Sequence, residues 1–243
     1  MPAYLQLVRR RHGGAMVAAD SELVIDGFTR TAVTFAVVAF QLAQPRPVRV
    51  AHHLHAPAHV VASVRAGIPC LLTVREPAEA VLSCCSREPY VSLAQALRAY
   101  ARFHETLAPF RAGFVAAPFD EVTQHFDVSI ERLNQRFGTH FAPFRHSDEN
   151  VRRCFGIIDQ RAQRPPWARE LGAFLSGRIT LAELDAAAAR HQGQELSALP
   201  EMRVQRPTAA RAAQKQALLA AYQAPELAAA RRRAELAYQA VLA

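Results

Sequence analysis

A continuous, mainly apolar run at residues 68–74 (IPCLLTV) constrains the fold more than any other segment. Gly67 precedes the run and Arg75-Glu76-Pro77 follows it, so its ends are sharply marked. Strands of a parallel sheet are covered on both faces, and they therefore show an unbroken apolar pattern instead of an alternating one. The run predicts a central strand of a parallel sheet.

Other strand and helix patterns alternate along the first 144 residues. Short apolar runs predict strands at residues 22–28, 49–55 and 113–119. Helical patterns occupy residues 34–43, 57–66, 77–86 and 92–110, and a further helix carries Ile130, Leu133 and Phe137 at helical spacing. Strands that alternate with helices predict an α/β fold with a mainly parallel sheet.

The character of the chain changes after about residue 144. The rest is helical in pattern and rich in Ala, Arg, Gln and Leu, and residues 209–243 predict two helices that meet near Pro225. We therefore expect an α/β core at residues 1–144 and a helical C-terminal extension at 145–243. The length of 243 residues suits a single domain in which the extension packs on the core.

The chain is basic, with a formal net charge of +8, and Lys215 is its only lysine. Such a balance favours anionic partners, and arginine grips phosphate through two parallel hydrogen bonds. The alternative is that the arginines lie on the surface and bind no particular partner. The run Arg231-Arg232-Arg233 could suit nucleic acid, but no aromatic residues or reader motif accompany it, so we expect no nucleic-acid partner.

The four cysteines, at positions 70, 84, 85 and 154, show no zinc-ligand spacing. We expect free thiols in a reducing cytoplasm, and we expect Cys70 to be buried. No apolar run is long enough to span a bilayer, and residues 1–14 lack the apolar segment of a secretory signal. These features predict a cytoplasmic protein with no membrane partner and no bound metal.

A possible anion-binding loop lies between the first strand and the first helix, in VIDGFTRTAVTF at residues 24–35. Compared with the nucleotide-binding pattern G-x-x-x-x-G-K-[ST], Gly27 and Thr34 fit, but Ala32 and Val33 replace the second glycine and the lysine. An ATPase or GTPase is therefore not expected. The positive charge of the loop comes from Arg30 instead. The alternative is an ordinary strand-to-helix turn capped by Thr31.

A second candidate motif, VREPAEAVLS, follows the central strand at residues 74–83. Arg75 leaves the end of the strand, Pro77 opens a helix, and Ser83 follows two turns later. The side chains of Arg75 and Ser83 can then converge on one phosphate. The alternative is that Arg75 pairs with Glu79 and Ser83 only packs.

These two motifs together resemble those of sulfotransferases that use 3′-phosphoadenylyl sulfate. The family's patterns are [KR]-[ST]-G-T-[TS]-[FWL] and R-[DEN]-P-x-[DE]-x-x-x-S. The resemblance covers residues 22–144, including the segment 119–144, and implies a P-loop NTPase-like sheet flanked by helices. The first pattern matches a six-residue loop, with departures at its third and fourth members: Arg30, Thr31, Ala32, Val33, Thr34 and Phe35.

The resemblance also implies roles for these residues. Arg30 would bind the bridging oxygen and the 5′-phosphate, with donors from Thr31 and Thr34. Arg75 and Ser83 would bind the 3′-phosphate. Thr29 stands where the family has proline, and alanine can replace glycine only where φ is negative or strain is tolerated.

The family often closes its 3′-phosphate site with a late basic segment. Our candidate is residues 204–208 (VQRPT), which include Arg206, followed by Arg211 and Lys215. The alternative for each is a solvated helix face.

Three histidines lie between the two motifs in RVAHHLHAP at residues 49–57. The family places a general base here, and alignment gives that position to His53. His52 would face the other side of the strand, and His55 would lie past its end, although the choice among the three stays open. A neutral imidazole suits removal of a hydroxyl proton. Ala51 stands where the family often has lysine.

The implied function is transfer of a sulfuryl group from 3′-phosphoadenylyl sulfate to a hydroxyl or amine, leaving adenosine 3′,5′-bisphosphate. His53 and Arg30 would carry the chemistry without a metal. The sequence names neither the acceptor, which we expect to be a small molecule or glycan, nor the oligomeric state. Two alternatives remain: a catalytically silent sulfotransferase-like binding module, and another P-loop transferase or kinase.

Overall fold

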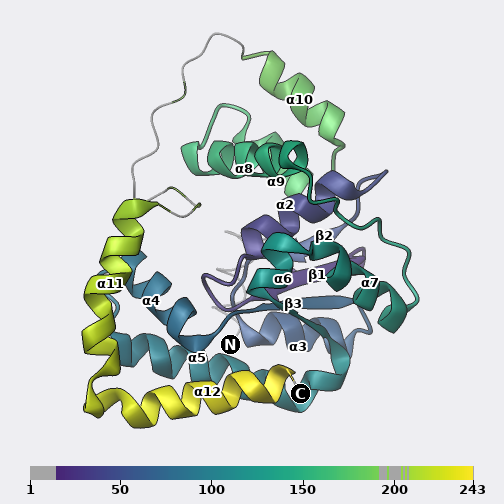
Figure 1. Ribbon diagram of the computed structural model, residues 1–243. Coiled ribbons are helices and arrows are strands. Elements are labelled where there is room, and N and C mark those ends of the chain that lie inside the picture. Colours follow the sequence, from purple (N-terminus) through teal and green to yellow (C-terminus); the bar gives the residue numbers. More distant parts are fainter. Residues whose placement is uncertain (1–14, 192–195, 197–203, 205, 207, 243) are drawn as a thin grey trace, which may run out of the picture.

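The computed structural model describes residues 15–191, 196, 204, 206 and 208–242. Residues 1–14, and Gln205 and Pro207 of the late basic segment, lie outside the described residues. Four strands form one parallel sheet in the order β2-β1-β3-β4 (Figure 1): β1 Leu23–Gly27, β2 Val50–His52, β3 Cys70–Val74 and β4 Val115–Pro118.

The two central strands, β1 and β3, are buried along their whole length. They pair in parallel, with Val24 opposite Cys70 and Gly27 opposite Thr73. The prediction that 68–74 contains a central parallel strand is therefore confirmed, and so is the α/β class. Because all four strands run the same way, their carboxyl ends lie at one edge of the sheet, where ligands of such folds bind.

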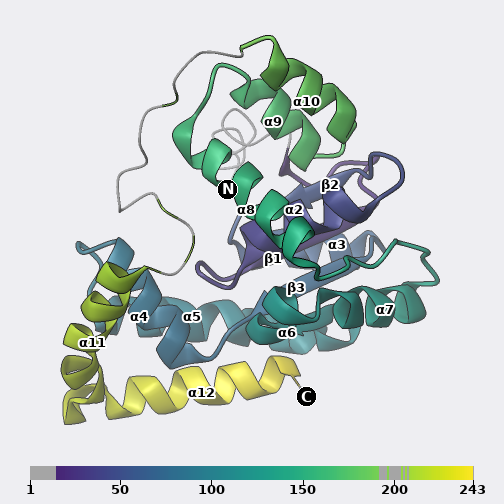
Figure 2. The ribbon, with the colours of Figure 1, turned by 45° about the horizontal axis from the view of Figure 1, so that its top comes forward.

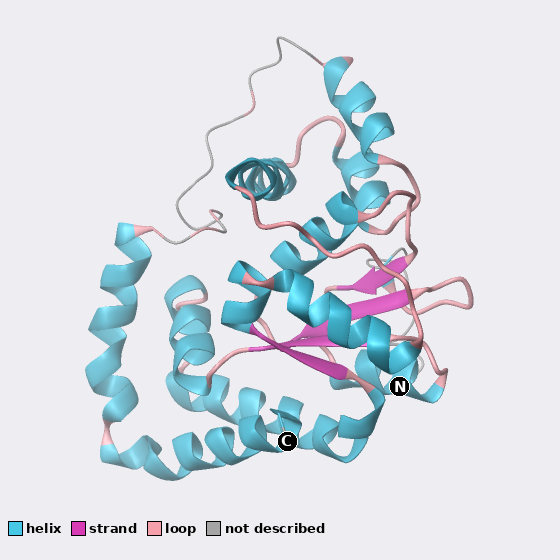
Figure 3. Ribbon diagram, turned by 45° about the vertical axis from the view of Figure 1, so that its right-hand side comes forward, coloured by secondary structure: helices cyan, strands magenta, loops and turns pink. Residues whose placement is uncertain are grey.

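Helices cover both faces of the sheet (Figures 1 and 3). The core on one side of the sheet includes residues of α2 (Val33–Ala43), α6 (Phe119–Gln124), α7 (Phe126–Phe137), α8 (Asp148–Gln163), α9 (Ala168–Leu175) and α10 (Leu181–Ala189), with α10 packed on α9. The core on the other side includes residues of α3 (Pro57–Arg65), α4 (Pro77–Arg87), α5 (Leu93–Leu107), α11 (Ala209–Gln223) and α12 (Ala228–Leu242), with α11 packed on α4 and α12 on α5.

Successive strand residues point to opposite faces, and this divides the interior into two cores. Ile25 and Leu71 pack with the first group of helices. Val24 and Leu72 pack with the second group. The apolar run in each central strand is continuous because both faces of the sheet are covered.

The helices after residue 144 contribute to both cores. Cys154 and Ile158 of α8 lie in the first, whereas Tyr238 and Val241 of α12 lie in the second, where α12 runs along α5. The predicted break near Pro225 is confirmed, since α11 ends at Gln223 and a 3-10 turn, Pro225–Leu227, leads into α12. Figure 2 shows α11 and α12 meeting at this corner.

Two predicted elements are shorter than expected. The strand predicted at 49–55 ends at His52, because His53 and His55 adopt positive φ angles that no strand can continue. The helix predicted at 92–110 ends at Leu107 and tightens into a 3-10 segment, Ala108–Gly113, in which Pro109 has no N–H to donate. All four cysteines are free and buried, as expected for Cys70. No helix among the described residues has both the length and the apolar character needed to cross a bilayer.

Candidate functional site

A cleft of about 570 Å³ opens at the carboxyl edge of the sheet. Its floor is the loop between β1 and α2, one wall comes from α8, and the other wall comes from α4 and α11. Its lining carries six arginines and one lysine against one glutamate: Arg30, Arg75, Arg87, Arg161, Arg206, Arg211, Lys215 and Glu88. The lining residues described here therefore favour an anionic ligand.

The β1–α2 loop turns through left-handed backbone where a nucleotide-binding loop would use glycine. Ala32 is the N-cap of α2 with φ 70° and ψ 20°, and Arg30 has φ 71°. Of the five non-glycine residues with positive φ in the described part of the chain, four lie in this loop and the adjacent β2–α3 loop: Arg30, Ala32, His53 and His55. Backbone strain concentrated in this way is typical of ligand-binding sites.

The Thr31 side chain does not face the cleft. It is fully buried, its hydroxyl donates to the Phe28 carbonyl at 2.7 Å, and it lies 2.8 Å from the hydroxyl of Thr73. A donor to a ligand from Thr31 would therefore be its backbone N–H. The alternative interpretation, in which Thr31 caps α2, is wrong, because the cap position is Ala32 and no side chain bonds the first turn.

The two candidate anion motifs meet in the cleft. Arg30 Nε donates to Ser83 Oγ at 3.1 Å, and Arg75 Nη1 donates to the Arg30 carbonyl at 3.3 Å. Arg75 also pairs with Glu79 at 2.9 Å, as the alternative interpretation predicts, and lies 3.8 Å over the Phe119 ring. The Arg30 guanidinium thus lies beside the Arg75 motif and not at a distance from it.

Arg30 stands in a concentration of positive charge. Burial, together with the nearby guanidinium groups of Arg87, Arg211 and Arg75, lowers its pKa to about 10. Bringing like charges together costs free energy that a bound anion would recover. This part of the cleft is therefore suited to a phosphate.

The late basic residues divide between the two walls. Arg211 is 9% exposed in the first turn of α11, where Thr208 accepts from its backbone N–H at 3.3 Å. Lys215 pairs with Glu79 at 2.6 Å, which ties α11 to α4. Arg206 is exposed on the other side, where it pairs with Asp159 of α8 and lies over the Phe155 ring. Only Arg211 and Lys215 lie on the Arg75 side.

His53 lines the cleft, next to the anion loop. Its Nε2 lies 2.9 Å from Thr34 Oγ1 and 3.4 Å from Arg161 Nη1, and its Nδ1 lies 2.8 Å from His52 Nδ1. Because arginine only donates, the Arg161 contact favours the tautomer in which Nε2 accepts and Nδ1 carries the proton. His53 therefore presents an unprotonated nitrogen toward the cleft, which is the form a general base needs.

Burial keeps this histidine neutral. It lowers the pKa of His53 well below its usual value, and the charge of Arg161 lowers it further. The pKa of His52 falls to about 3 for the same two reasons. Asp26 fixes the loop around them: its carboxylate accepts from the backbone N–H groups of Leu54 and His55 and from His59 Nδ1 at 2.6 Å.

The remaining loop residues form the first turn of α2. Val33 and Phe35 are buried, and Phe35 packs against Phe155 with ring centroids 5.7 Å apart. Ala51, where the family often has lysine, is buried in the second core and contributes nothing to the cleft.

Two arginines of the cleft were not predicted from the sequence. Arg87 lies one turn beyond Ser83 on α4, so the helical spacing i, i+4 would have found it. Arg161 comes from α8, outside the segment covered by the resemblance, and no sequence signal places that helix over the β1–α2 loop.

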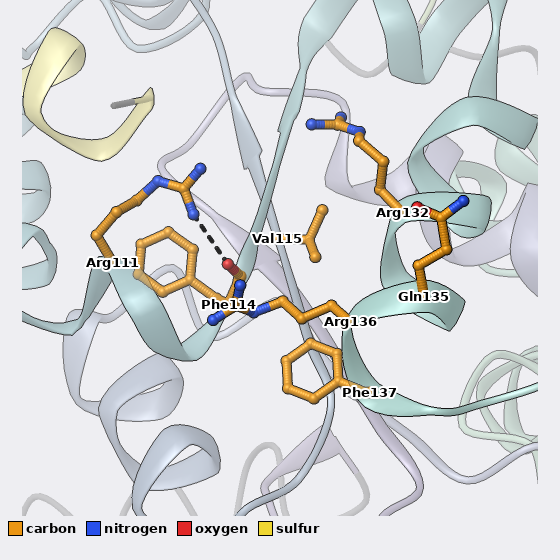
Figure 4. Close-up of a pocket in the computed structure, with 7 residues that line it drawn as sticks. All are labelled: Arg111, Phe114, Val115, Arg132, Gln135, Arg136 and Phe137. Atoms are coloured by element: carbon orange, nitrogen blue, oxygen red, sulfur yellow. Dashed lines mark hydrogen bonds between the residues drawn. The ribbon is translucent and has the colours of Figure 1, made fainter.

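A second hollow lies at the opposite, amino end of β4 (Figure 4). Its arginines are bonded to main-chain carbonyls: Arg111 to Phe114 and Leu242, Arg132 to Ala116, and Arg136 to Ala112. These contacts join α7 and the 3-10 segment to each other and to β4, and the Arg111 contact to Leu242 attaches the end of α12. Within the described residues, no group of His, Cys, Asp or Glu side chains is placed to hold a metal ion.

Comparisons with known proteins add no relative to this picture. No protein-family model, no curated protein and no solved structure matches the chain. The functional interpretation therefore depends on the residues of the cleft.

Proposed function

We propose that the protein is a sulfotransferase that moves a sulfuryl group from 3′-phosphoadenylyl sulfate to a hydroxyl or amine. The fold would then be a P-loop NTPase-like sheet whose nucleotide loop has lost its lysine. The observation that carries the proposal is the direct contact between two motifs 53 residues apart, in which Arg30 donates to Ser83 beside Arg75. Both motifs resemble one family, and both line one cleft with a neutral histidine.

The charge of the cleft supports this ligand. A nucleotide with two phosphate monoesters carries about −3 to −4 at neutral pH. The wall formed by α4 and α11 offers Arg75, Arg87, Arg211 and Ser83 to the 3′-phosphate. The N–H groups of the β1–α2 loop, at the start of α2, would receive the 5′-phosphosulfate, as helix N-termini receive anions. Arg30 lies between the two.

The chemistry assigned to these residues is a single in-line transfer. The acceptor oxygen or nitrogen forms a bond to sulfur while its proton passes to Nε2 of His53. The bond between sulfur and the bridging oxygen breaks, and its electron pair goes to the 5′-phosphate of the departing bisphosphate. Arg30 and the loop N–H groups stabilise that growing charge, which is commonly the largest contribution to such a transfer.

Two variants test the assignment. Arg75→Ala should weaken binding of adenosine 3′,5′-bisphosphate about tenfold to 100-fold, since a charge-assisted contact is lost. His53→Ala should keep that affinity within about threefold and lose sulfuryl transfer. Isothermal titration calorimetry measures the first, and transfer of labelled sulfate from the donor measures the second. Arg98→Ala, an exposed arginine on α5, is the matched control.

The outcomes separate the proposal from its alternatives. Wild-type protein that binds the bisphosphate but transfers nothing to any acceptor would be a silent binding module. Binding of ATP that depends on Mg²⁺ would identify a kinase-like transferase. Full activity of both Arg75→Ala and His53→Ala would reject the residue assignments.

A further inference from the structure

Arg161 is a partly buried guanidinium with weak contacts. Its pKa is lowered by burial, and Nη1 makes two hydrogen bonds, at 3.4 Å to Thr34 Oγ1 and 3.4 Å to His53 Nε2. These distances lie beyond the usual range for N–H donors, so a better acceptor would replace them readily. No carboxylate of the described residues lies within ion-pair distance of Arg161.

Two acids near Arg161 or on the neighbouring helix pair with other arginines. Asp159 pairs with Arg206, and Asp185 pairs with Arg153. Arg161 therefore brings a charge into the cleft that no described side chain balances. A charge withdrawn from water without a partner is costly, and an anion in the cleft would remove that cost.

The position of Arg161 separates it from the phosphate cluster. It comes from the α8 wall and contacts His53. Arg75, Arg87 and Arg211 lie on the opposite side of the cleft, with α4 and α11. Beside it the same wall offers apolar surface from Phe155 and Ile158, with Phe35 at the floor. The acceptor must approach His53, so it must also approach Arg161.

We propose that Arg161 binds an acidic group on the acceptor, so that the substrates of this protein are anionic molecules with an apolar body beside the reacting hydroxyl or amine. This inference rests on the sulfotransferase function proposed above. The acidic group would be a carboxylate, sulfate or phosphate that takes the place of Thr34 and His53 as the partner of the guanidinium. His53 Nε2 then loses the Arg161 contact, and the acceptor's hydroxyl or amine can take the place of the Thr34 hydroxyl beside it.

Matched acid and amide probes test this assignment in the full-length protein. With the bisphosphate at saturation, calorimetry compares 4-hydroxybenzoate with 4-hydroxybenzamide, and 4-hydroxyphenylacetate with its amide. We expect each acid to bind at least about tenfold more tightly than its amide. Arg161→Ala should remove most of that difference and leave the amides within about twofold. Arg161→Lys should keep part of it, and Arg152→Ala, an exposed arginine on the same helix, should keep all of it.

The affinity of each variant for adenosine 3′,5′-bisphosphate tests the role of Arg161 separately from the sulfotransferase function. Arg161→Ala should bind the bisphosphate within about threefold of wild type. A loss as large as that of Arg30→Ala would assign Arg161 to the donor and overturn the inference. Equal binding of acids and amides, or no binding of either acid, would overturn it as well. Wild-type protein without affinity for the bisphosphate would reject the sulfotransferase function itself.

Discussion

Gly27 occupies a position where no other residue fits. A Cβ added there would lie closer than 3.0 Å to the Thr73 side chain, the Thr73 carbonyl and the Thr31 hydroxyl. These atoms belong to the central strands and the buried turn, so they cannot move aside cheaply. Gly27→Ala should lower the free energy of unfolding by about 2–4 kcal/mol, measured by urea denaturation.

Gly156 supplies the opposite case. It lies exposed within α8, and an added Cβ would meet nothing within 4 Å. Gly156→Ala should raise the free energy of unfolding by about 0.5–1 kcal/mol through higher helix propensity. A Gly27→Ala protein as stable as wild type would mean that the β1–β3 contact is looser than described.

Ala32 holds a left-handed conformation that glycine adopts more easily. Its φ of 70° costs an alanine about 1–2 kcal/mol, and the greater freedom of glycine in the unfolded chain offsets part of the relief. Ala32→Gly should therefore raise the free energy of unfolding by up to about 1 kcal/mol. Ala36→Gly, inside α2, should lower it by about 1–2 kcal/mol. Destabilisation by Ala32→Gly would contradict the left-handed turn.

Some residues of the candidate site could be predicted from the sequence, whereas their conformations could not. Arg30 and Arg75 were predictable as cleft residues because each follows a strand of the parallel sheet, and Ser83 was predictable because it lies on the helix that starts just after Arg75. The positive φ of Ala32 was not predictable, since alanine usually avoids it. Nor was the buried hydroxyl of Thr31, because its partner Thr73 comes from another strand.

At the scale of elements, three histidines are kept neutral inside the fold. Burial lowers the pKa of His52 to about 3 and of His104 to about 4, and that of His53 falls well below its usual value. Each native-state pKa lies below the unfolded value near 6.5. Below pH 6.5 these histidines bind protons in the unfolded chain but stay neutral in the folded protein. Their contribution to stability is therefore full above this pH and is lost as pH falls.

Urea denaturation between pH 7.5 and 5 checks this. Each histidine should lower the free energy of unfolding by up to about 1.4 kcal/mol per pH unit below 6.5. His104→Phe, within the aromatic cluster of Phe28, Tyr100 and Phe103, should remove about a third of the slope. Stability that is constant between pH 7 and 5 would show that these histidines accept protons in the folded state.

Element types followed from periodicity, whereas some ends did not. The strand at β2 stops three residues early because Asp26, distant in sequence, holds the backbone of Leu54 and His55. The helices after residue 144 were predictable as helices. Their division between two faces of the sheet was not, because it depends on which apolar surfaces remain uncovered after the α/β core has formed.

At the scale of the whole molecule, the cleft exists only because the two parts of the chain come together. Residues before 144 supply the sheet edge, both anion motifs and α4, while α8 supplies one wall and α11 completes the other. Composition indicated an anionic partner, but the net charge of +8 did not say where the charge would gather. The tertiary structure gathers six arginines at one edge of the sheet.

The most direct measurement is nucleotide selectivity of the wild-type protein in thermal denaturation. Adenosine 3′,5′-bisphosphate at about 100 times its dissociation constant should raise the midpoint by about 5–10 °C, and at the same concentration adenosine 5′-phosphate and adenosine 3′-phosphate should each raise it less. ATP with Mg²⁺ should raise the midpoint no more than the two adenosine monophosphates do. No shift with the bisphosphate, or a larger shift with ATP and Mg²⁺, would contradict a cleft built for a doubly phosphorylated adenosine.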